Sequence, residues 1–198
     1  MKSLVKVLLP VCMFSSVSYA EQETGFFIGL DIANSIVAEE KQELEIPDGP
    51  TISDDVSYDA LTTAISLGYR FETNNRFLVS STKIDADAGS AGDEEFTGLD
   101  LDWHFVYGEE KVLPYWGIGF GFYTLEDTAA LTEDNEDVSG IAVNLMGGIK
   151  YAVIPQAEFD LSYRIKSISW QDLEASNGMT LSLSESISSI NLGAAFFF

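Results

Sequence analysis

The sequence predicts an all-β protein, a closed eight-stranded antiparallel up-and-down transmembrane β-barrel. Three observations support this prediction. Large apolar residues alternate with small or polar ones at a period of two, which is the side-chain spacing of a β-strand. The connections between these segments alternate between short and long. Finally, the apolar face of the segments is too bulky to fit inside a sheet of this size.

Eight segments carry the period-two alternation. In the glycine-rich segment, Trp116, Ile118, Phe120 and Phe122 alternate with glycine and tyrosine. The apolar run within the first twenty residues is too short for a helical membrane span, and beyond Ala20 no stretch approaches one. The predicted strands cover Phe26–Asn34, Leu61–Phe71, Phe77–Lys83, Thr97–Tyr107, Pro114–Thr124, Ile141–Tyr151, Glu158–Ile168 and Ile187–Phe198.

The links between the predicted strands are of two kinds, and they alternate strictly. Three are short, at residues 72–75, 108–111 and 154–156. The other four are long and polar, at residues 35–58, 84–95, 125–138 and 169–186. A sheet whose two ends face different compartments has this layout, with tight turns on the periplasmic side and long loops outside. A soluble sandwich has no reason to sort its loops in this way.

The large apolar side chains are expected to face lipid. The interior of an eight-stranded barrel is just wide enough for small and polar side chains, so Trp116, Phe120 and Leu145 must point outward. Open sheet edges are costly in hydrocarbon, so the first and last strands must pair. Aromatic residues near the strand ends predict interfacial girdles. They are Tyr69, Phe71, Phe105, Tyr107, Tyr115, Tyr151 and Phe198 on the turn side, and Phe122, Tyr123 and Trp170 on the loop side.

The first twenty residues have the layout of a secretory signal peptide. Lys2 and Lys6 precede a short apolar stretch, and Ser18 and Ala20 occupy the −3 and −1 positions of a cleavage site. We expect cleavage after Ala20, which leaves residues 21–198 as one barrel domain. This domain contains no cysteine and carries eight basic and 32 acidic residues, a net charge of −24. Such a balance argues against nucleic-acid binding, which needs basic side chains.

The C-terminal strand carries a recognisable pattern. A polar residue, a glycine, a hydrophobic residue and a terminal aromatic occur at Asn191, Gly193, Phe196 and Phe198. This end resembles the C-terminal assembly signal of outer-membrane proteins. The segment Pro114–Thr124 resembles a strand common in small outer-membrane barrels, and the chain from residue 21 onward resembles the eight-stranded OmpA transmembrane-domain and OmpX/Ail type. The resemblance implies a location in the outer membrane of a Gram-negative bacterium, and an end read by the barrel-assembly machinery.

Charged residues on the polar face are expected to pair inside the lumen, because a narrow interior does not tolerate an unpaired charge. The single histidine, His104, is expected near the turn side, hydrogen-bonded to Asp100 or Asp102. That placement disfavours lipid chemistry at the outer leaflet, so no enzyme activity is expected. The same charges could instead line a gated pore. The predicted lumen network is Asp31, Arg70, Lys83, Asp100, Asp102, His104, Lys150, Glu158, Asp160, Arg164 and Lys166.

The four long connections hold most of the acidic residues, with Lys41 as their only basic residue. Solvation alone explains such a rim. Carboxylates can also bind Ca²⁺ or Mg²⁺, which could bridge to lipopolysaccharide phosphates, or the loops could recognise a basic ligand. The tightest candidate metal cluster is Asp85, Asp87, Asp93, Glu94 and Glu95. One cysteine and one histidine leave no Cys/His zinc site.

These observations predict a monomer that contacts outer-membrane lipid and lipopolysaccharide and acts structurally or through its loops, as an adhesin does. One alternative is a small OmpW-like transporter or narrow pore, which for apolar solutes would need an apolar lumen; Arg70, Lys150 and Arg164 make that less favourable. A lipid A-modifying enzyme is the third possibility.

Overall fold

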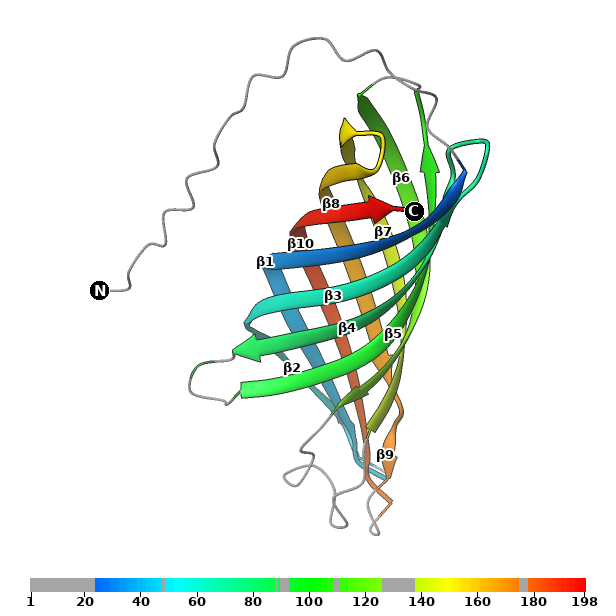
Figure 1. Ribbon diagram of the computed structural model, residues 1–198. Coiled ribbons are helices and arrows are strands. Elements are labelled where there is room, and N and C mark those ends of the chain that lie inside the picture. Colours follow the sequence, from blue (N-terminus) through cyan, green and yellow to red (C-terminus); the bar gives the residue numbers. More distant parts are fainter. Residues whose placement is uncertain are drawn as a thin grey trace, which may run out of the picture.

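The computed structural model describes residues 24–47, 49–87, 89, 93–108, 111–125, 138–174 and 178–198, so the predicted signal peptide lies outside the described residues. The described chain forms one antiparallel sheet (Figure 1). No helix among these residues is long and apolar enough to cross a membrane. The strands are β1 (Gly25–Glu45), β2 (Thr51–Ser57), β3 (Asp59–Arg70), β4 (Arg76–Asp87), β5 (Asp93–Val106), β6 (Val112–Leu125), β7 (Val138–Ile154), β8 (Ala157–Trp170), β9 (Leu173–Glu174) and β10 (Thr180–Phe197).

The sheet closes on itself between β1 and β10. These strands pair antiparallel from Phe27 opposite Phe197 to Glu45 opposite Thr180, with a register shift between Ser35 and Val37. The other barrel strands pair in sequence order, so the barrel is of the up-and-down type. β2 and β3 both pair with β1 and continue one another along it. The prediction of a closed eight-stranded barrel is therefore confirmed.

Strand pairing extends further than the sequence predicted. Residues 35–58 and 169–186 were expected to be loops, but β1 runs to Glu45, β2 pairs back on it, and β10 begins at Thr180. The outer parts of β1, β2 and β10 thus form a three-stranded sheet, which reaches the lower end of Figure 1 and is here called the extension. Apolar residues on its inward face explain the continued pairing. Leu183 belongs to the buried core and Leu181 packs against it, and Leu44 is the cross-strand partner of Leu181. Ile52, which also pairs with Leu44, is 52% exposed.

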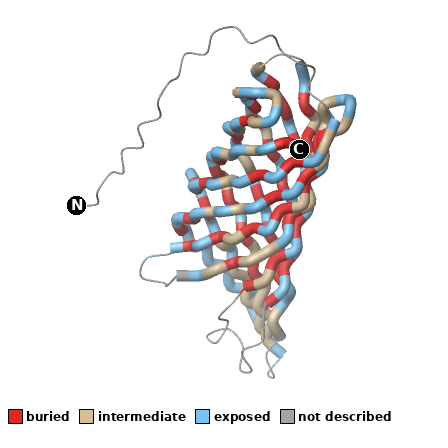
Figure 2. Tube along the Cα trace, in the orientation of Figure 1, coloured by how far each residue is buried: buried red, intermediate tan, exposed pale blue. Residues whose placement is uncertain are grey.

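The outward face of the barrel wall is apolar, as predicted. Trp116 is 44% exposed, Phe120 55% and Leu145 52%, while the residues between them are buried or face inward. Figure 2 shows this alternation of exposed and buried positions along the strands. On β10 the outward residues change from Ile190 to serine, and on β1 from Val37 to Glu39 and Lys41. The extension therefore lies beyond the apolar belt, on the loop side.

Aromatic rings form a girdle at the turn side, whereas of the three predicted loop-side girdle residues only Phe122 faces outward. Phe26, Tyr69, Phe71, Trp103 and Phe105 make successive ring contacts around the outer wall. The predicted girdle residues Tyr115, Tyr123 and Trp170 are instead buried. Their side chains occupy inward positions of β6 and β8, where polar partners or other rings meet them.

Candidate functional site

In the lumen, three inward polar residues of β5 lie opposite three glycines of β6. Asp100, Asp102 and His104 on β5 point inward, and the residues opposite them on β6 are the glycines Gly121, Gly119 and Gly117. Because glycine has no side chain, each polar group of β5 can extend across the face of β6. The glycine-rich segment thus makes room for charge in an interior that would otherwise be full.

Asp100 is the centre of the loop-side layer of this network. Its carboxylate accepts hydrogen bonds from Lys166 Nζ at 2.8 Å, Tyr123 Oη at 2.7 Å, Thr82 Oγ1 at 2.8 Å and Asn144 Nδ2 at 2.9 Å. Lys166 also contacts the Tyr123 hydroxyl. All five side chains are buried. The charge of Asp100 is therefore paired with one cation and solvated by three neutral donors, as a buried ion pair requires.

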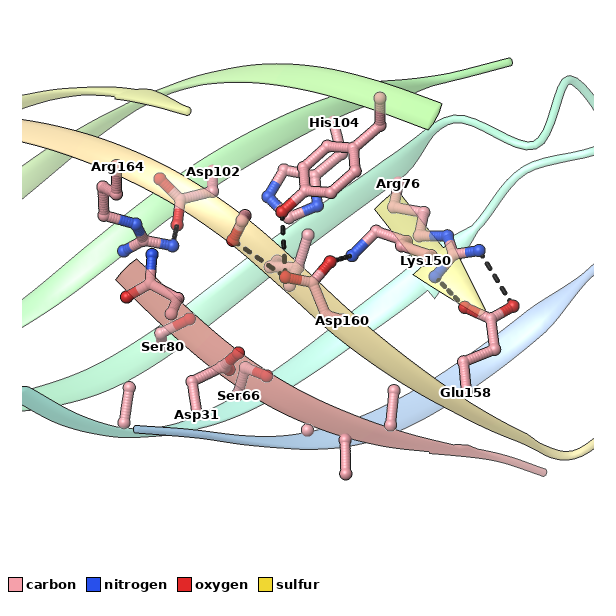
Figure 3. Close-up of a pocket in the computed structure, with 18 of the residues that line it drawn as sticks. Asp31, Ser66, Arg76, Ser80, Asp102, His104, Lys150, Glu158, Asp160 and Arg164 are labelled. Carbon is pink, nitrogen blue, oxygen red and sulfur yellow. Dashed lines mark hydrogen bonds and ion pairs between the residues drawn. The ribbon is translucent and has the colours of Figure 1, made fainter. Parts of the chain in front are cut away.

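Asp160 is the centre of the middle layer (Figure 3). It receives hydrogen bonds from Lys150 Nζ at 2.7 Å, Tyr115 Oη at 3.1 Å and Ser162 Oγ at 2.8 Å. Arg164 Nη2 lies 3.4 Å from Asp102 Oδ2 in the same region. Most of these groups come from β7 and β8, which pair with one another, so the strand register alone brings Lys150 opposite Asp160.

In the turn-side layer of the network, two arginines bind the same carboxylate, that of Glu158. Arg76 Nη1 is 2.5 Å from Glu158 Oε2, and Arg70 Nη1 is 3.3 Å from Glu158 Oε1. Both guanidinium groups also lie over the ring of Phe197, at 4.0 Å for Arg70 and 5.3 Å for Arg76. The last strand of the barrel is thereby tied to the hairpin of β3 and β4 through the lumen.

Little space remains between these layers. A cavity of about 40 Å³ is lined by Asp31, Ser66, Asn191 and Arg164, among others. One buried water needs at least ~10–15 Å³, so the cavity has room for only a few waters. Ser66 Oγ and Asn191 Nδ2 have no hydrogen-bond partner among the described residues, and they are suited to bind such waters.

The predicted lumen residues lie inside the barrel with one exception. Lys83 is on the outward face of β4, where its Nζ contacts Asp85 at 3.1 Å and Glu95 at 2.7 Å. Its side chain is 44% exposed, so its assignment to the lumen was wrong. Lys83 stands at the loop-side edge of the apolar belt, where an outward cation can reach polar surroundings. The residues found inside are Asp31, Arg70, Asp100, Asp102, His104, Lys150, Glu158, Asp160, Arg164 and Lys166.

His104 does not bind a carboxylate, contrary to the expectation. Its Nε2 lies 3.1 Å from the Met146 sulfur, and its Nδ1 has no hydrogen-bond partner among the described residues. Its ring packs against Tyr115, with ring centroids 4.8 Å apart. Asp102, the expected partner, is bound by Arg164 and Asn144 instead.

Several lumen residues were missed in the sequence. Arg76 was overlooked because it precedes the first apolar residue of its strand, and Tyr115 and Tyr123 because they were assigned to the girdles. The alternation itself held the signal, since both tyrosines share a face of β6 with the three glycines. Asn144 and Thr82 are inward residues whose partners come from strands other than their own, and pairing of that kind is visible only in the folded barrel.

The loop-side end of the lumen is filled by an apolar core. Phe96 and Trp170 pack at a centroid distance of 5.4 Å, and both are buried. Figure 2 shows buried positions continuing along the strands toward this end of the molecule. The core also includes Ala38, Tyr58, Ala60, Ile84, Ala86, Tyr123, Leu125, Val138, Ala142, Ile168, Leu183 and Ile187.

Three carboxylates from different strands meet beside this core. Glu40 of β1, Glu94 of β5 and Glu185 of β10 place carboxylate oxygens within 4.8 Å of one another. The Tyr58 hydroxyl donates a hydrogen bond to Glu185, which is only 3% exposed. Burial, with Glu40 and Glu94 close by, raises the pKa of Glu185 to about 8, although the Tyr58 hydrogen bond opposes this shift. Burial likewise raises the pKa of Glu94.

Among the described side chains, the candidate metal cluster predicted from the sequence does not bring three carboxylates together. Asp85 and Glu95 are bound to Lys83 on the outward face, and the Asp87 carboxylate accepts a hydrogen bond from the Gly89 amide at 2.9 Å. Glu94 points the opposite way, toward Glu40 and Glu185. Neighbouring residues of a strand face opposite sides, so consecutive acids such as Glu94 and Glu95 cannot converge. The side chain of Asp93 lies outside the described residues.

The outward face of the extension is acidic. Glu39, Glu43, Glu45 and Asp55 lie on this face, where Lys41 is the one cation among the described residues. Lys41 Nζ is 2.5 Å from Glu43 Oε1. The β10 residues paired with these β1 positions are Ser186, Ser184, Ser182 and Thr180, so the face is otherwise neutral and hydrophilic.

Comparisons with known proteins agree with this architecture. A family model described as outer membrane protein beta-barrel domain matches residues 7–196. The chain belongs to this outer-membrane β-barrel family. No curated protein matches it in sequence.

Two solved structures illustrate the likeness of fold. Neisserial surface protein A has a TM-score of 0.55 and 20% identity, covering 88% of this chain and 97% of that one. AlkL, determined by solid-state NMR in DMPC lipid bilayers, has a TM-score of 0.55 and 15% identity, covering 94% of this chain and 96% of that one. As a member of the outer-membrane β-barrel family, the protein resides in the cell outer membrane, with its apolar belt against lipid.

Proposed function

We propose that this outer-membrane β-barrel is a closed surface scaffold that presents its acidic extension to basic partners. The observation that carries the proposal is the two-sided construction of the extension. Its inner face continues the apolar core of the barrel, and its outer face carries Glu39, Glu43, Glu45 and Asp55. A rigid sheet that holds carboxylates in fixed positions beyond the membrane is suited to electrostatic recognition of a basic surface.

The filled lumen favours a role as a scaffold rather than a role as a channel. Four layers obstruct it, three of ion pairs and one of apolar side chains, and the cavity described above, between the polar layers, is about 40 Å³. Transport of apolar solutes would need an apolar path, whereas Lys150, Arg164 and Lys166 are arranged along this interior. The contacts of His104 with Met146 and Tyr115 likewise disfavour a histidine-centred lipid-modifying site.

Binding of a poly-L-lysine peptide to the protein in lipid nanodiscs tests the proposal. Neutralising Glu39→Gln, Glu45→Gln and Asp55→Asn together should weaken binding by about tenfold, because it removes most of the charge on one face. The matched control neutralises Glu72→Gln, Asp85→Asn and Glu95→Gln, whose side chains are exposed and lie outside the extension, so net charge changes equally but that face stays intact. Equal loss of affinity in both triple variants would mean that net charge, not the extension, attracts the peptide.

A further inference from the structure

One edge of the extension is unpaired among the described residues, and it belongs to β2. Strands β2 and β3 lie end to end along the same side of β1. Strand β4 continues the sheet beside β3 only, because it ends at Asp87, opposite Asp59. No described strand lies beyond β2, and its side chains are exposed except for the half-buried Val56. Such an edge presents free backbone N–H and C=O groups to which another extended chain can pair.

The hydrogen bonds around β2 show which of its backbone groups face the open edge. The N–H of Tyr58, just after β2, donates to the Ala38 carbonyl oxygen of β1 at 3.0 Å. Because successive residues of an antiparallel strand direct these groups to opposite edges, every second residue faces the open side. These residues are Thr51, Ser53, Asp55 and Ser57. The Asp55 N–H donates to Asp54 Oδ1 at 3.0 Å, so a carboxylate oxygen takes the place of the carbonyl oxygen of a further strand.

The two faces of β2 differ in chemistry. Ser53 and Ser57 pair with Glu43 and Glu39 of β1, so a strand added beside β2 would have its outward side chains next to the acidic face. The opposite face of β2 carries Ile52, which is 52% exposed, and Val56. The inward side chains of an added strand would contact these two apolar residues. The edge therefore suits a segment in which basic residues alternate with apolar residues.

We propose that β2 binds an extended segment of a partner polypeptide, with alternating basic and apolar residues, as an additional strand of the extension. This inference rests on the proposed function and specifies how the basic partner is held. Backbone hydrogen bonds to a sheet edge supply affinity, and alternate side chains supply specificity. A second copy of β2 would instead bring its own two aspartates to Asp54 and Asp55, and like charges on neighbouring strands are unfavourable.

Backbone methylation of a peptide separates strand addition from attraction by charge alone. The probe is a seven-residue peptide, the length of β2, in which lysine alternates with valine. Two further forms carry backbone N-methyl groups on every lysine or on every valine. Both forms keep the charge of the parent peptide, but each loses the N–H donors of only one edge of the strand.

Affinities are measured with the wild-type protein in lipid nanodiscs. One methylated form should bind about tenfold more weakly than the parent peptide, because it cannot donate to β2, and the other should bind nearly as well. Equal affinities of all three peptides would overturn strand addition but leave the proposed function standing, since charge alone would then hold them. Failure of both the alternating peptide and poly-L-lysine to bind would contradict the proposed function as well.

A substitution at the edge provides a second test. Ser53→Pro removes one N–H that faces the open side, and proline is tolerated at such positions of edge strands. Ser53→Ala is the control, because it loses the same hydroxyl group but keeps the N–H. Ser53→Pro should weaken binding of the parent peptide about tenfold, and Ser53→Ala should not. Equal affinities of the two variants would contradict the inference.

The oligomeric state without peptide tests the competing occupant. Sedimentation of the detergent-solubilised protein should show a monomer for wild type and for Ser53→Pro. A wild-type dimer that Ser53→Pro dissociates would assign the edge to a second copy of the chain and overturn the inference. If Ser53→Pro fails to fold, the methylated peptides still decide the question, because they are tested on the wild-type protein.

Discussion

Gly119 on β6 lies directly opposite Asp102 on β5, and a methyl group on Gly119 would overlap the Asp102 carboxylate. The same relationship links Gly193 of β10 with Asp31 of β1. Gly193 therefore has a reason to be glycine that is independent of any assembly signal, because the lumen network needs the space.

Replacement of Gly119 by alanine should destabilise the barrel. We expect a loss of about 1–3 kcal/mol in the free energy of unfolding, since the added methyl forces Asp102 away from Arg164 and Asn144. Urea unfolding in lipid vesicles, followed by heat-modifiable gel mobility, measures this loss. Gly147→Ala is the control, because a methyl there meets only the Tyr115 carbonyl oxygen at 3.7 Å. Equal effects of the two substitutions would show that the space opposite Asp102 is not required.

Loss of the Lys166 charge should be severe. Lys166→Met leaves the buried Asp100 carboxylate with neutral donors only, and breaking a buried pair typically costs about 3–5 kcal/mol. Lys83→Met serves as the comparison, because its ion pairs with Asp85 and Glu95 are exposed and should contribute little. The same unfolding experiment reports both. A larger effect at Lys83 than at Lys166 would contradict the placement of these two lysines.

The stability of the loop-side end should fall as the pH rises. The pKa of Glu185 is about 8 in the folded protein, against an ordinary value of 4.5. Between these values the folded state keeps a proton that the unfolded chain releases, so stability decreases with pH by at most ~1.4 kcal/mol per pH unit. Unfolding midpoints measured from pH 5 to pH 8 should show this decline in wild type.

Glu185→Gln should remove most of that decline, because glutamine can still accept the Tyr58 hydrogen bond but does not titrate. Glu72→Gln, at an exposed position on the turn side, controls for a general change in charge. If the stability of wild type and of Glu185→Gln depended on pH in the same way, a group other than Glu185 would be responsible for the decline.

Period-two alternation in the sequence predicted most of the fold. It separated the lipid face from the lumen face because the two environments differ in polarity, as Phe120 and Gly121 illustrate. Lys83 was misplaced because its charge was taken to require an inward position. The alternation itself puts it on the outward face with Val79 and Ser81, and at the margin of the belt a lysine can face outward. The alternation also left the ends of β1 and β10 undefined, since polar outward residues there resemble a loop.

The carboxyl cluster could not be predicted from the sequence. Glu40, Glu94 and Glu185 belong to three strands, and only the stagger of β5 across the lumen from β1 and β10 brings them together. Sequence proximity pointed instead to Asp85, Asp87, Asp93, Glu94 and Glu95, a set in which strand geometry turns Glu94 away from Glu95. Contacts across the barrel depend on register and closure, neither of which is a local property.

Current across planar lipid bilayers that contain the purified protein tests the closed barrel most directly. The three layers of ion pairs and the core around Phe96 and Trp170 predict no stable conductance steps at neutral pH. Sustained open-channel currents, proportional to the amount of folded protein inserted, would contradict the occluded lumen on which the scaffold proposal rests.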